Sequence, residues 1–257
     1  EEECTEAQAT NGAAPPPDIY VDDDADPGWY NATHVQTIQE GIHNATAGQT
    51  IYVHNGTYQE NVVVNKTVNL QGENQDTTIV NGNGSSDVIQ VIADQVNVSN
   101  FTVQNSGSDW FDAGIKLWGV QDCHIENNTA RHNRHAIYLS ASSTCSIKNN
   151  TLNTNTHYGI YASSSHNTSI KENAIISNAE GGIRLSVSSQ NAIKDNIVVN
   201  NSHHGVYVYA SNSNAIAGNT VINNTQEGII LHASDGTTIA ENTVSNNTRG
   251  GIRLSSS

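Results

Sequence analysis

The chain has 257 residues, with 10 Lys and Arg against 25 Asp and Glu and a formal net charge of -15 at pH 7. This acidity argues against nucleic acid and anionic membrane surfaces as partners, because phosphate groups are bound by clustered Lys and Arg. No segment is apolar over the length that a membrane span requires. We therefore expect no nucleic-acid partner and no direct membrane span.

Residues 1–17 are acidic and then rich in Ala and Pro, which is typical of a tail or linker. Neither an initiator Met nor a signal peptide is present, which indicates a processed chain or an excised piece. Cys4 lies in this segment and has three readings: an inert thiol, a cross-link between chains, or the attachment point of an anchor.

A strand is predicted at Ile19–Val21, followed by an acidic run. Asp22, Asp24 and Asp26 alternate as ligands do in calcium loops, but the distal bidentate acid of such a loop is missing. The alternatives are a calcium site and a solvated acidic turn. The sequence requires no cofactor, and calcium is the one candidate that it offers.

Residues 33–47 read as an amphipathic helix. Thr33 and Gln36 form a predicted capping box, and Ile38 and Ile42 fall on one face. A single helix ahead of a repeat array is typical of a cap over the first open repeat.

Residues 50–105 alternate apolar and polar residues over short runs that predict strands. Asn100 and Asn105 are predicted to hold the first two positions of the Asn columns described below. The spacing then stretches over residues 106–112, a predicted loop that exposes Trp110 and Phe111. Long loops with exposed aromatic side chains on a regular scaffold often carry function.

From residue 114 to residue 257 the chain repeats one frame, Gly-Ile-x-Leu, whose first Ile or Val recurs after 22 residues and then after 23 five times. A fixed period with strand-like alternation predicts a solenoid of short strands, a single-stranded right-handed parallel β-helix with three strands per rung. Two columns of Asn recur in register and are expected to form ladders of inward amides. They are Asn128, Asn150, Asn173, Asn196, Asn219 and Asn242, and Asn133, Asn155, Asn178, Asn201, Asn224 and Asn247.

Two of the three cysteines, Cys123 and Cys145, lie 22 residues apart in one column of adjacent rungs. Neighbouring rungs bring their Cβ atoms near disulfide distance, and we expect a disulfide. A disulfide would indicate an oxidising compartment. The alternative is two free thiols stacked by the repeat.

Thirteen Asn-x-Ser/Thr sequons are compatible with a glycosylated protein at the cell surface, although an Asn-rich chain forms many by chance. The candidate glycosylation sites are Asn31, Asn44, Asn55, Asn65, Asn83, Asn97, Asn100, Asn127, Asn149, Asn167, Asn200, Asn223 and Asn246.

The residues after the predicted helix resemble the opening of many β-helix proteins, pectin methylesterases among them. The closer resemblance is to the NosD-like, carbohydrate-binding and sugar-hydrolysis (CASH) β-helix proteins of archaeal cell surfaces. It rests on Ile19-Tyr20-Val21-Asp22-Asp23-Asp24, His34-Val35-Gln36-Thr37-Ile38, Thr50-Ile51-Tyr52-Val53-His54-Asn55-Gly56-Thr57-Tyr58 and Thr67-Val68-Asn69-Leu70-Gln71-Gly72. With the repeats it covers residues 18–257 and is specific for fold rather than activity.

Several activities of related proteins lack their motifs here. We find neither the Gly-x-Gln-Ala segment and paired aspartates of the esterases nor the Tyr-Gly-Phe-Asp-Pro-His type of motif of alginate epimerases. Copper delivery, which the NosD name implies, would require a His, Met and Cys cluster, and the chain has no Met.

One outward strip remains as the candidate site, because the x position of each repeat and the residue two further on point away from the core. The resemblance implies polysaccharide binding along such a strip, and stacked rings suit sugar faces. The candidate ligand-binding residues are Trp110, Lys116, Trp118, Tyr138, Tyr161, Arg184, Tyr207 and Tyr209. An ordinary solvated β surface is the alternative.

A catalytic role has weaker candidates: Arg184 or His157 as the base of a lyase, and Glu180 with Glu227 as the carboxylate pair of a hydrolase. The last rung, ending at Arg253-Leu254-Ser255-Ser256-Ser257, shows no cap. Continuation of the native chain, head-to-tail stacking into a filament and fraying are the alternatives. We predict an extracellular or cell-surface module with a structural, adhesive or carbohydrate-binding role, with a polysaccharide lyase or hydrolase as the alternative.

Overall fold

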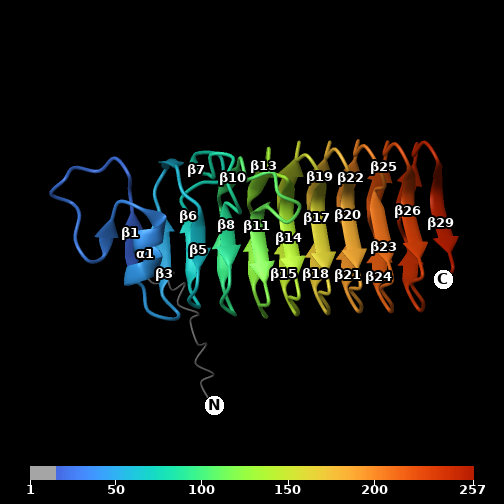
Figure 1. Cartoon of the computed structure of the whole chain (residues 1–257), viewed down its shortest axis with the longest axis horizontal. Coiled ribbons are helices and arrows are strands. Elements are labelled where there is room, and N and C mark those ends of the chain that lie inside the picture. The colour runs from blue at the N-terminus through green and yellow to red at the C-terminus, as the bar shows by residue number, and fades with distance from the viewer. Residues whose placement is uncertain (1–15) are drawn as a thin grey trace, which may run out of the picture.

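The computed structural model describes residues 16–257 as an elongated solenoid whose short strands stack in chain order from one end to the other (Figure 1). Every neighbouring pair of strands within its three sheets is parallel. The predicted all-β parallel helix, with three strands per rung, is confirmed. The predicted tail, residues 1–17, and Cys4 lie wholly or mostly outside the described residues.

The first sheet, called sheet A, has 11 strands. They are β1 (Ile19–Val21), β2 (His34–Val35), β3 (Thr50–Val53), β6 (Asn69–Gly72), β9 (Asn97–Ser99), β12 (His124–Glu126), β15 (Ser146–Lys148), β18 (Ser169–Lys171), β21 (Ala192–Lys194), β24 (Ala215–Ala217) and β27 (Thr238–Ala240).

The second sheet, called sheet B, has nine strands. They are β4 (Gly56–Tyr58), β7 (Thr78–Asn81), β10 (Thr102–Gln104), β13 (Thr129–Arg131), β16 (Thr151–Asn153), β19 (Ala174–Ile176), β22 (Ile197–Val199), β25 (Thr220–Ile222) and β28 (Thr243–Ser245).

The third sheet, called sheet C, also has nine strands and carries the outward strip. They are β5 (Val62–Val64), β8 (Ile89–Val91), β11 (Ala113–Trp118), β14 (His135–Ser140), β17 (Tyr158–Ser163), β20 (Gly181–Ser186), β23 (Val206–Tyr209), β26 (Glu227–His232) and β29 (Gly250–Ser255).

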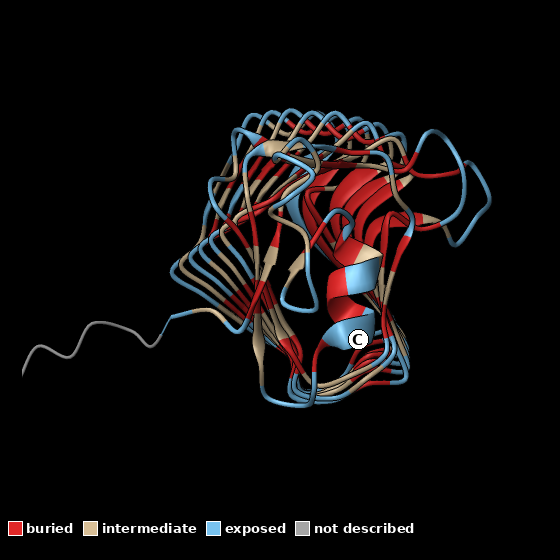
Figure 2. Ribbon diagram, turned by 90° about the vertical axis from the view of Figure 1, so that its left-hand side faces the viewer, coloured by how far each residue is buried: buried red, intermediate tan, exposed pale blue. Residues whose placement is uncertain are grey.

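The core runs along the solenoid axis as one continuous apolar column (Figure 2). Each three-residue strand turns its middle or its two end residues inward, as in the Ser-Ile-Lys strand β15, where Ile147 is fully buried. Stacking repeats the same inward residue on each rung, so Ile125, Ile147 and Ile170 lie in register. The 23-residue period therefore places like residues on top of one another.

The two predicted Asn ladders are confirmed. Asn150 Nδ2 donates to the carbonyl oxygens of Ile125 and Lys148 and to Asn173 Oδ1, and the backbone N–H of Asn150 donates to the same Oδ1. Each amide thus satisfies bend backbone that is buried away from water. The second column repeats this pattern, as Asn155 and Asn178 show.

The prediction that Asn100 and Asn105 open the two ladders is wrong by one residue. Phe101 and Ser106 hold those positions, since their backbone N–H groups donate to Asn128 and Asn133. Asn100 itself adopts a positive φ of 64° at the preceding bend, a left-handed conformation that Asn tolerates better than most residues.

The helix α1 (Ile38–Asn44) is shorter than the predicted 33–47, and its N-cap is Thr37, whose side chain accepts from the backbone N–H of Glu40. The predicted Thr33–Gln36 capping box is wrong, because Thr33 bonds to Asn31 instead. The carboxylate of Glu60 also accepts from the first two helical N–H groups.

Seen from the N-terminal end, α1 lies in front of the buried interior (Figure 2). Ile38 and Ile42 join the core. Its role as a cap stays a prediction.

The last strand, β29, leaves Ile252 52% and Leu254 61% exposed. Head-to-tail assembly through this edge stays a prediction. No helix of the described residues has the length and apolarity to cross a bilayer.

Candidate functional site

The loop before β11 folds over the outer face of sheet C. Its end is fixed by Asp87, whose Oδ1 accepts from the backbone N–H of Ala113 at 2.9 Å. Within the loop, the backbone N–H of Asp109 donates to Asp112 Oδ2 at 2.9 Å. The loop sets Trp110 and Phe111 beside the strip while leaving them 48% and 55% exposed. The expectation that this loop exposes Trp110 and Phe111 is confirmed.

The predicted outward column is in register. Lys116, Tyr138, Tyr161, Arg184 and Tyr207 are direct neighbours on successive strands of sheet C. The rings of Phe111 and Tyr138 stack at 5.9 Å, and those of Tyr138 and Tyr161 at 5.2 Å. We call the aromatic residues Trp110, Phe111, Trp118, Tyr138, Tyr158, Tyr161 and Tyr207 the ring cluster.

Tyr138 and Tyr161 are only 4% and 8% exposed, although both point outward from the sheet. They are covered because the two rings stack on each other, because Phe111 lies on Tyr138 and because the Arg184 guanidinium lies over Tyr161. Both therefore form the floor of the face, whereas the exposed Phe111 and Trp118 offer free ring surface.

A hollow of about 250 Å³ lies at the start of this face, lined by Phe111, Lys116, Trp118, Tyr138 and Ser140. Lys116 Nζ lies 5.6 Å from the Trp118 ring and 5.8 Å from the Tyr138 ring. It also pairs with Asp87 at 3.0 Å. Burial raises the pKa of Asp87, and the hydrogen bond from Lys116 opposes that rise.

Arg184 is held among three rings. Its Cζ lies 5.5, 5.4 and 5.3 Å from the ring centres of Tyr158, Tyr161 and Tyr207. Its Nη1 donates to the Tyr158 hydroxyl at 3.0 Å. This packing fixes the guanidinium plane.

His157, a candidate base, has both ring nitrogens engaged. Arg134 Nη2 lies 2.8 Å from Nε2, and since Arg can only donate, Nε2 must accept. Nδ1 then carries the proton and donates to the carbonyl oxygen of Thr156 at 2.7 Å. This arrangement leaves no free lone pair for proton abstraction.

His135 is a buried imidazole that the sequence did not single out. It is fully buried, and its ring stacks on that of Tyr158 at 5.9 Å. Its Nε2 atom lies 3.0 Å from the carbonyl oxygen of Trp110. Burial, with smaller contributions from His157, Arg134 and Arg184, lowers the pKa of His135 to about 3. The imidazole is therefore neutral around pH 7 and acts as a packing element under the loop.

This neutral histidine predicts a pH dependence of stability. As the pH falls below the ordinary His value of 6.5, the unfolded chain takes up a proton that the folded chain does not take up until the pKa of about 3. The stabilisation that comes from neutral His135 is therefore complete above pH 6.5 and is lost as the pH falls toward 3. We expect the free energy of unfolding to fall about 2 kcal/mol more between pH 7.5 and pH 5 in the parent than in His135→Gln, measured by urea unfolding. Equal falls in both proteins would contradict it.

The two candidate carboxylates each face a histidine of the intervening rung. Glu180 Oε2 lies 3.5 Å from His203 Nδ1, and Glu227 Oε2 lies 3.1 Å from His204 Nδ1. Glu227 is 4% exposed and also pairs with Arg253 at 3.2 Å. The pKa of Glu227 is lowered, since hydrogen bonds and the two cations outweigh burial, and burial lowers the pKa of His204. Glu227 is therefore ionised and paired, which suits a structural role better than that of a proton donor.

Tyr209, the last predicted ligand-binding residue, lies at the edge of the ring cluster. Its ring stacks on His232 at 5.4 Å and meets Tyr207 edge-on at 6.2 Å. It extends the aromatic surface toward the last rungs.

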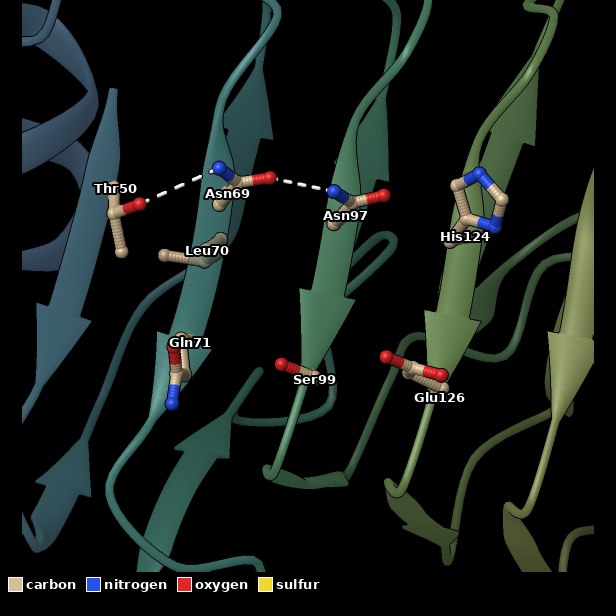
Figure 3. A pocket seen from close by; sticks show the side chains of 8 residues that line it. All are labelled: Thr50, Asn69, Leu70, Gln71, Asn97, Ser99, His124 and Glu126. Atoms are coloured by element: carbon tan, nitrogen blue, oxygen red, sulfur yellow. Dashed lines mark hydrogen bonds between the residues drawn. The ribbon is translucent and has the colours of Figure 1, made fainter. Parts of the chain in front are cut away.

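A second hollow, which the sequence did not reveal, lies on the outer face of sheet A (Figure 3). It measures about 340 Å³. Asn97 Nδ2 donates to Asn69 Oδ1 at 2.5 Å, and Asn69 Nδ2 donates to Thr50 Oγ1 at 3.3 Å. Asn69, Asn97 and His124 occupy aligned positions on successive strands of sheet A. This alignment could have revealed the hollow, but it requires the pairing of the strands to be known. Its lining is Thr50, Asn69, Leu70, Gln71, Asn97, Ser99, His124 and Glu126.

The acidic turn groups differently from the prediction. Oxygen atoms of Asp22, Asp23 and Asp24 lie within 4.8 Å of one another, whereas Asp26 is outside this group. Asp22 Oδ1 already accepts from the backbone N–H of Asp24 at 3.2 Å. Burial raises the pKa of Asp23. Calcium at this turn stays a prediction.

Cys123 and Cys145 are both buried and both free thiols, so the predicted disulfide is not formed in this structure and the alternative of stacked thiols describes it. Cys145 Sγ lies 3.3 Å from the carbonyl oxygen of Ser143. The hydrogen bond that the Cys145 thiol donates to Cys123, together with burial, raises the pKa of Cys145, which keeps that sulfur protonated. An oxidising compartment therefore gains no support from these residues.

None of the 13 sequon Asn residues is buried. The side-chain nitrogens of Asn31, Asn44 and Asn97 already donate hydrogen bonds. Glycosylation of the sequons stays a prediction.

The stacked rungs, the three parallel sheets and the inward Asn ladders define the class of right-handed parallel β-helix proteins. The chain belongs to the NosD family, described as periplasmic copper-binding protein (NosD), whose model matches residues 42–226 and 176–257. No curated protein matches the chain.

Solved structures share the fold at low identity. The A-module of the mannuronan C-5 epimerase AlgE6 of Azotobacter vinelandii is 17% identical with a TM-score of 0.66, covering 84% of this chain and 74% of its own. The catalytic domain of a GH87 alpha-1,3-glucanase in complex with nigerose is 15% identical with a TM-score of 0.71, covering 98% and 47%. The Agl-KA catalytic domain is 13% identical with a TM-score of 0.61, covering 80% and 50%. The chain thus spans about half of the last two.

The family's name implies copper, but the described residues do not fit it. Copper prefers imidazole and sulfur ligands, usually three or more. Within residues 16–257 the one group of three or more close His, Cys, Asp or Glu ligands is Asp22, Asp23 and Asp24, which supplies hard oxygen atoms alone. The chain has no Met, and the two buried thiols have no third ligand in reach.

Proposed function

We propose that this chain is a carbohydrate-binding β-helix module that works outside the cytoplasm and holds a polysaccharide or cell-surface glycan along the outer face of sheet C. One observation carries the proposal: a hollow of about 250 Å³ edged by exposed Phe111 and Trp118 opens onto the stacked rings of Phe111, Tyr138 and Tyr161. Ring surfaces bind sugar faces with little loss of side-chain entropy. Two proteins of the same fold, a mannuronan C-5 epimerase and an alpha-1,3-glucanase, act on polysaccharides by name and support the same class of ligand.

The polymer would run along the solenoid axis. Successive rungs of parallel strands repeat at roughly 4.8 Å. The rings from Trp118 to Tyr207 therefore form a track rather than a single pocket. Phe111 and Trp118 contact the sugar, and the buried Tyr138 and Tyr161 hold the surface flat.

The test is the loss of exposed ring surface. We expect Trp118→Ala to weaken polysaccharide binding roughly tenfold, because an aromatic contact contributes about 1.4 kcal/mol. The measurement is affinity electrophoresis against a panel of acidic and neutral polysaccharides. Trp29→Ala is the matched control, since Trp29 lies in the N-terminal loop against His34. Equal effects of the two substitutions, or no binding to any polysaccharide, would contradict the proposal.

A polysaccharide lyase or hydrolase is the second candidate, favoured by the fold shared with an epimerase module and with the catalytic domain of a glucanase. It predicts shortening of the bound polymer, followed by viscometry. The double variant Glu180→Gln and Glu227→Gln should abolish that cleavage, and cleavage that survives it would exclude these residues as catalytic.

A further inference from the structure

The ring cluster holds two cations that no acid of the described chain neutralises. Lys116, Lys148, Lys171 and Arg253 all lie within 4.0 Å of a carboxylate oxygen. Arg134 and Arg184 form no such pair with any residue between 16 and 257. Lys66, Arg131, Lys194 and Arg249 also lack such a pair within these residues, so what sets Arg134 and Arg184 apart is their place against aromatic rings and the burial of their Nε atoms.

Three acids on this side of the solenoid are already engaged, and Asp109 and Asp112 of the loop before β11 form no ion pair with either arginine. Asp87 pairs with Lys116, Glu180 with His203, and Glu227 with His204 and Arg253. The two guanidinium groups instead face rings and a neutral imidazole. Arg134 Cζ lies 5.2 Å from the Trp110 ring, and Arg184 Cζ lies among three tyrosines.

Both guanidinium groups are also incomplete as hydrogen-bond donors. The Nε atoms of Arg134 and Arg184 are buried and have no partner. Arg134 Nη1 and Arg184 Nη2 make no hydrogen bond within residues 16–257, since only Arg134 Nη2 and Arg184 Nη1 are engaged. A fixed guanidinium with such a free donor suits a carboxylate or another oxyanion. His135 adds no charge beside them, because burial lowers its pKa to about 3.

We propose that the sheet C face binds sugars that carry an anionic group, with Arg184 and Arg134 as the counter-ions; this inference rests on the proposed function and narrows its ligand. Arg184 lies in β20 and Arg134 immediately before β14. They are two rungs apart, roughly 10 Å along the axis. One acidic polymer lying on the track can therefore meet both cations while its rings pack on the aromatic surface.

A carboxylate and a sulfate ester share this chemistry, and matched polymers separate them. The full chain is titrated by calorimetry with polygalacturonate and with its fully methyl-esterified form, then with dextran sulfate and with dextran, at fixed salt. We expect at least one anionic polymer to bind tenfold or more tightly than its neutral counterpart. Preference for polygalacturonate identifies a uronate ligand, and preference for dextran sulfate a sulfated one.

Substitutions then test the two arginines. Arg184→Gln should remove most of the preference for the anionic polymer, measured as the ratio of its affinity to that of the neutral polymer, and Arg134→Gln, at a separate rung, provides the same test should Arg184→Gln fold poorly. Arg184→Lys keeps the positive charge but lacks the planar guanidinium, and it should retain only part of the preference for the anionic polymer. Arg249→Gln is the control of equal charge change, because Arg249 lies on a later turn against Gln226.

The outcomes separate this inference from the proposed function. Neutral and anionic forms that bind equally well, with binding lost in Trp118→Ala, overturn the role of the arginines and leave carbohydrate binding in place. Equal losses in Arg184→Gln and Arg249→Gln indicate general charge attraction and overturn it as well. No binding to any of the four polymers overturns both.

Discussion

We expect Asn173→Ala to lower the free energy of unfolding by about 4 kcal/mol, since several buried groups lose their partners at once. Asn173 Nδ2 donates to the carbonyl oxygens of Ile147 and Lys171 and to Asn196 Oδ1, all within 3.1 Å. Its Oδ1 accepts from the backbone and the side chain of Asn150, both at 3.0 Å. Replacing the Asn173 side chain by a methyl group leaves these partners unpaired in an interior that water does not reach.

Asn242→Ala is the control for this prediction, because Asn242 occupies the same column near the last rung. It makes equivalent bonds to Ile216 and Ala240, but it is only partly buried. Water can replace the lost partners there, and the loss should stay below about 1.5 kcal/mol. Chemical unfolding followed by circular dichroism measures both. Similar losses of stability for the two substitutions would show that burial does not determine how much a ladder Asn contributes to the free energy of unfolding.

The second large effect is expected from a glycine. A Cβ on Gly182 would lie 2.5 Å from the carbonyl oxygen of Gly205 and would overlap Cγ1 of Val198. Backbone cannot move aside without shifting the rung, so Gly182→Ala should destabilise the fold by about 3 kcal/mol.

The same column supplies the comparison for Gly182→Ala. Gly251 ends the series, and an added Cβ there would meet only Val244 Cγ1, at 3.8 Å. We expect the unfolding midpoint of Gly251→Ala to stay near that of the parent while that of Gly182→Ala falls clearly below it. A tolerated Gly182→Ala would mean that adjacent rungs separate more easily than the packing implies.

Periodicity predicted the fold because the solenoid repeats its contacts at the repeat length of the sequence. Residues 23 apart lie on top of one another, so columns such as Ile147, Ile170 and Ile193 could be written down without coordinates. The same logic failed where the period breaks. Asn100 looks like a ladder residue by type, but the irregular rungs before residue 106 shift the register by one position.

The site was harder to predict because its contacts are not periodic. Register placed Tyr138, Tyr161 and Arg184 in one column, yet the burial of Tyr138 depends on Phe111 from a loop of irregular length. The neutral state of His135 depends on the same cover. Pairings such as Glu227 with His204 join neighbouring rungs through side-chain direction, which sequence spacing alone does not give.

The stacking of rungs also determines how the molecule comes apart. Each rung contacts mainly the rung before and the rung after it, so loss of structure propagates inward from the ends as it does in other linear repeat arrays. Hydrogen exchange should therefore be fastest at the first and last strands and slowest in the middle. The ring cluster spans β11 to β23, away from both ends of the described solenoid, and is thus the last surface to melt.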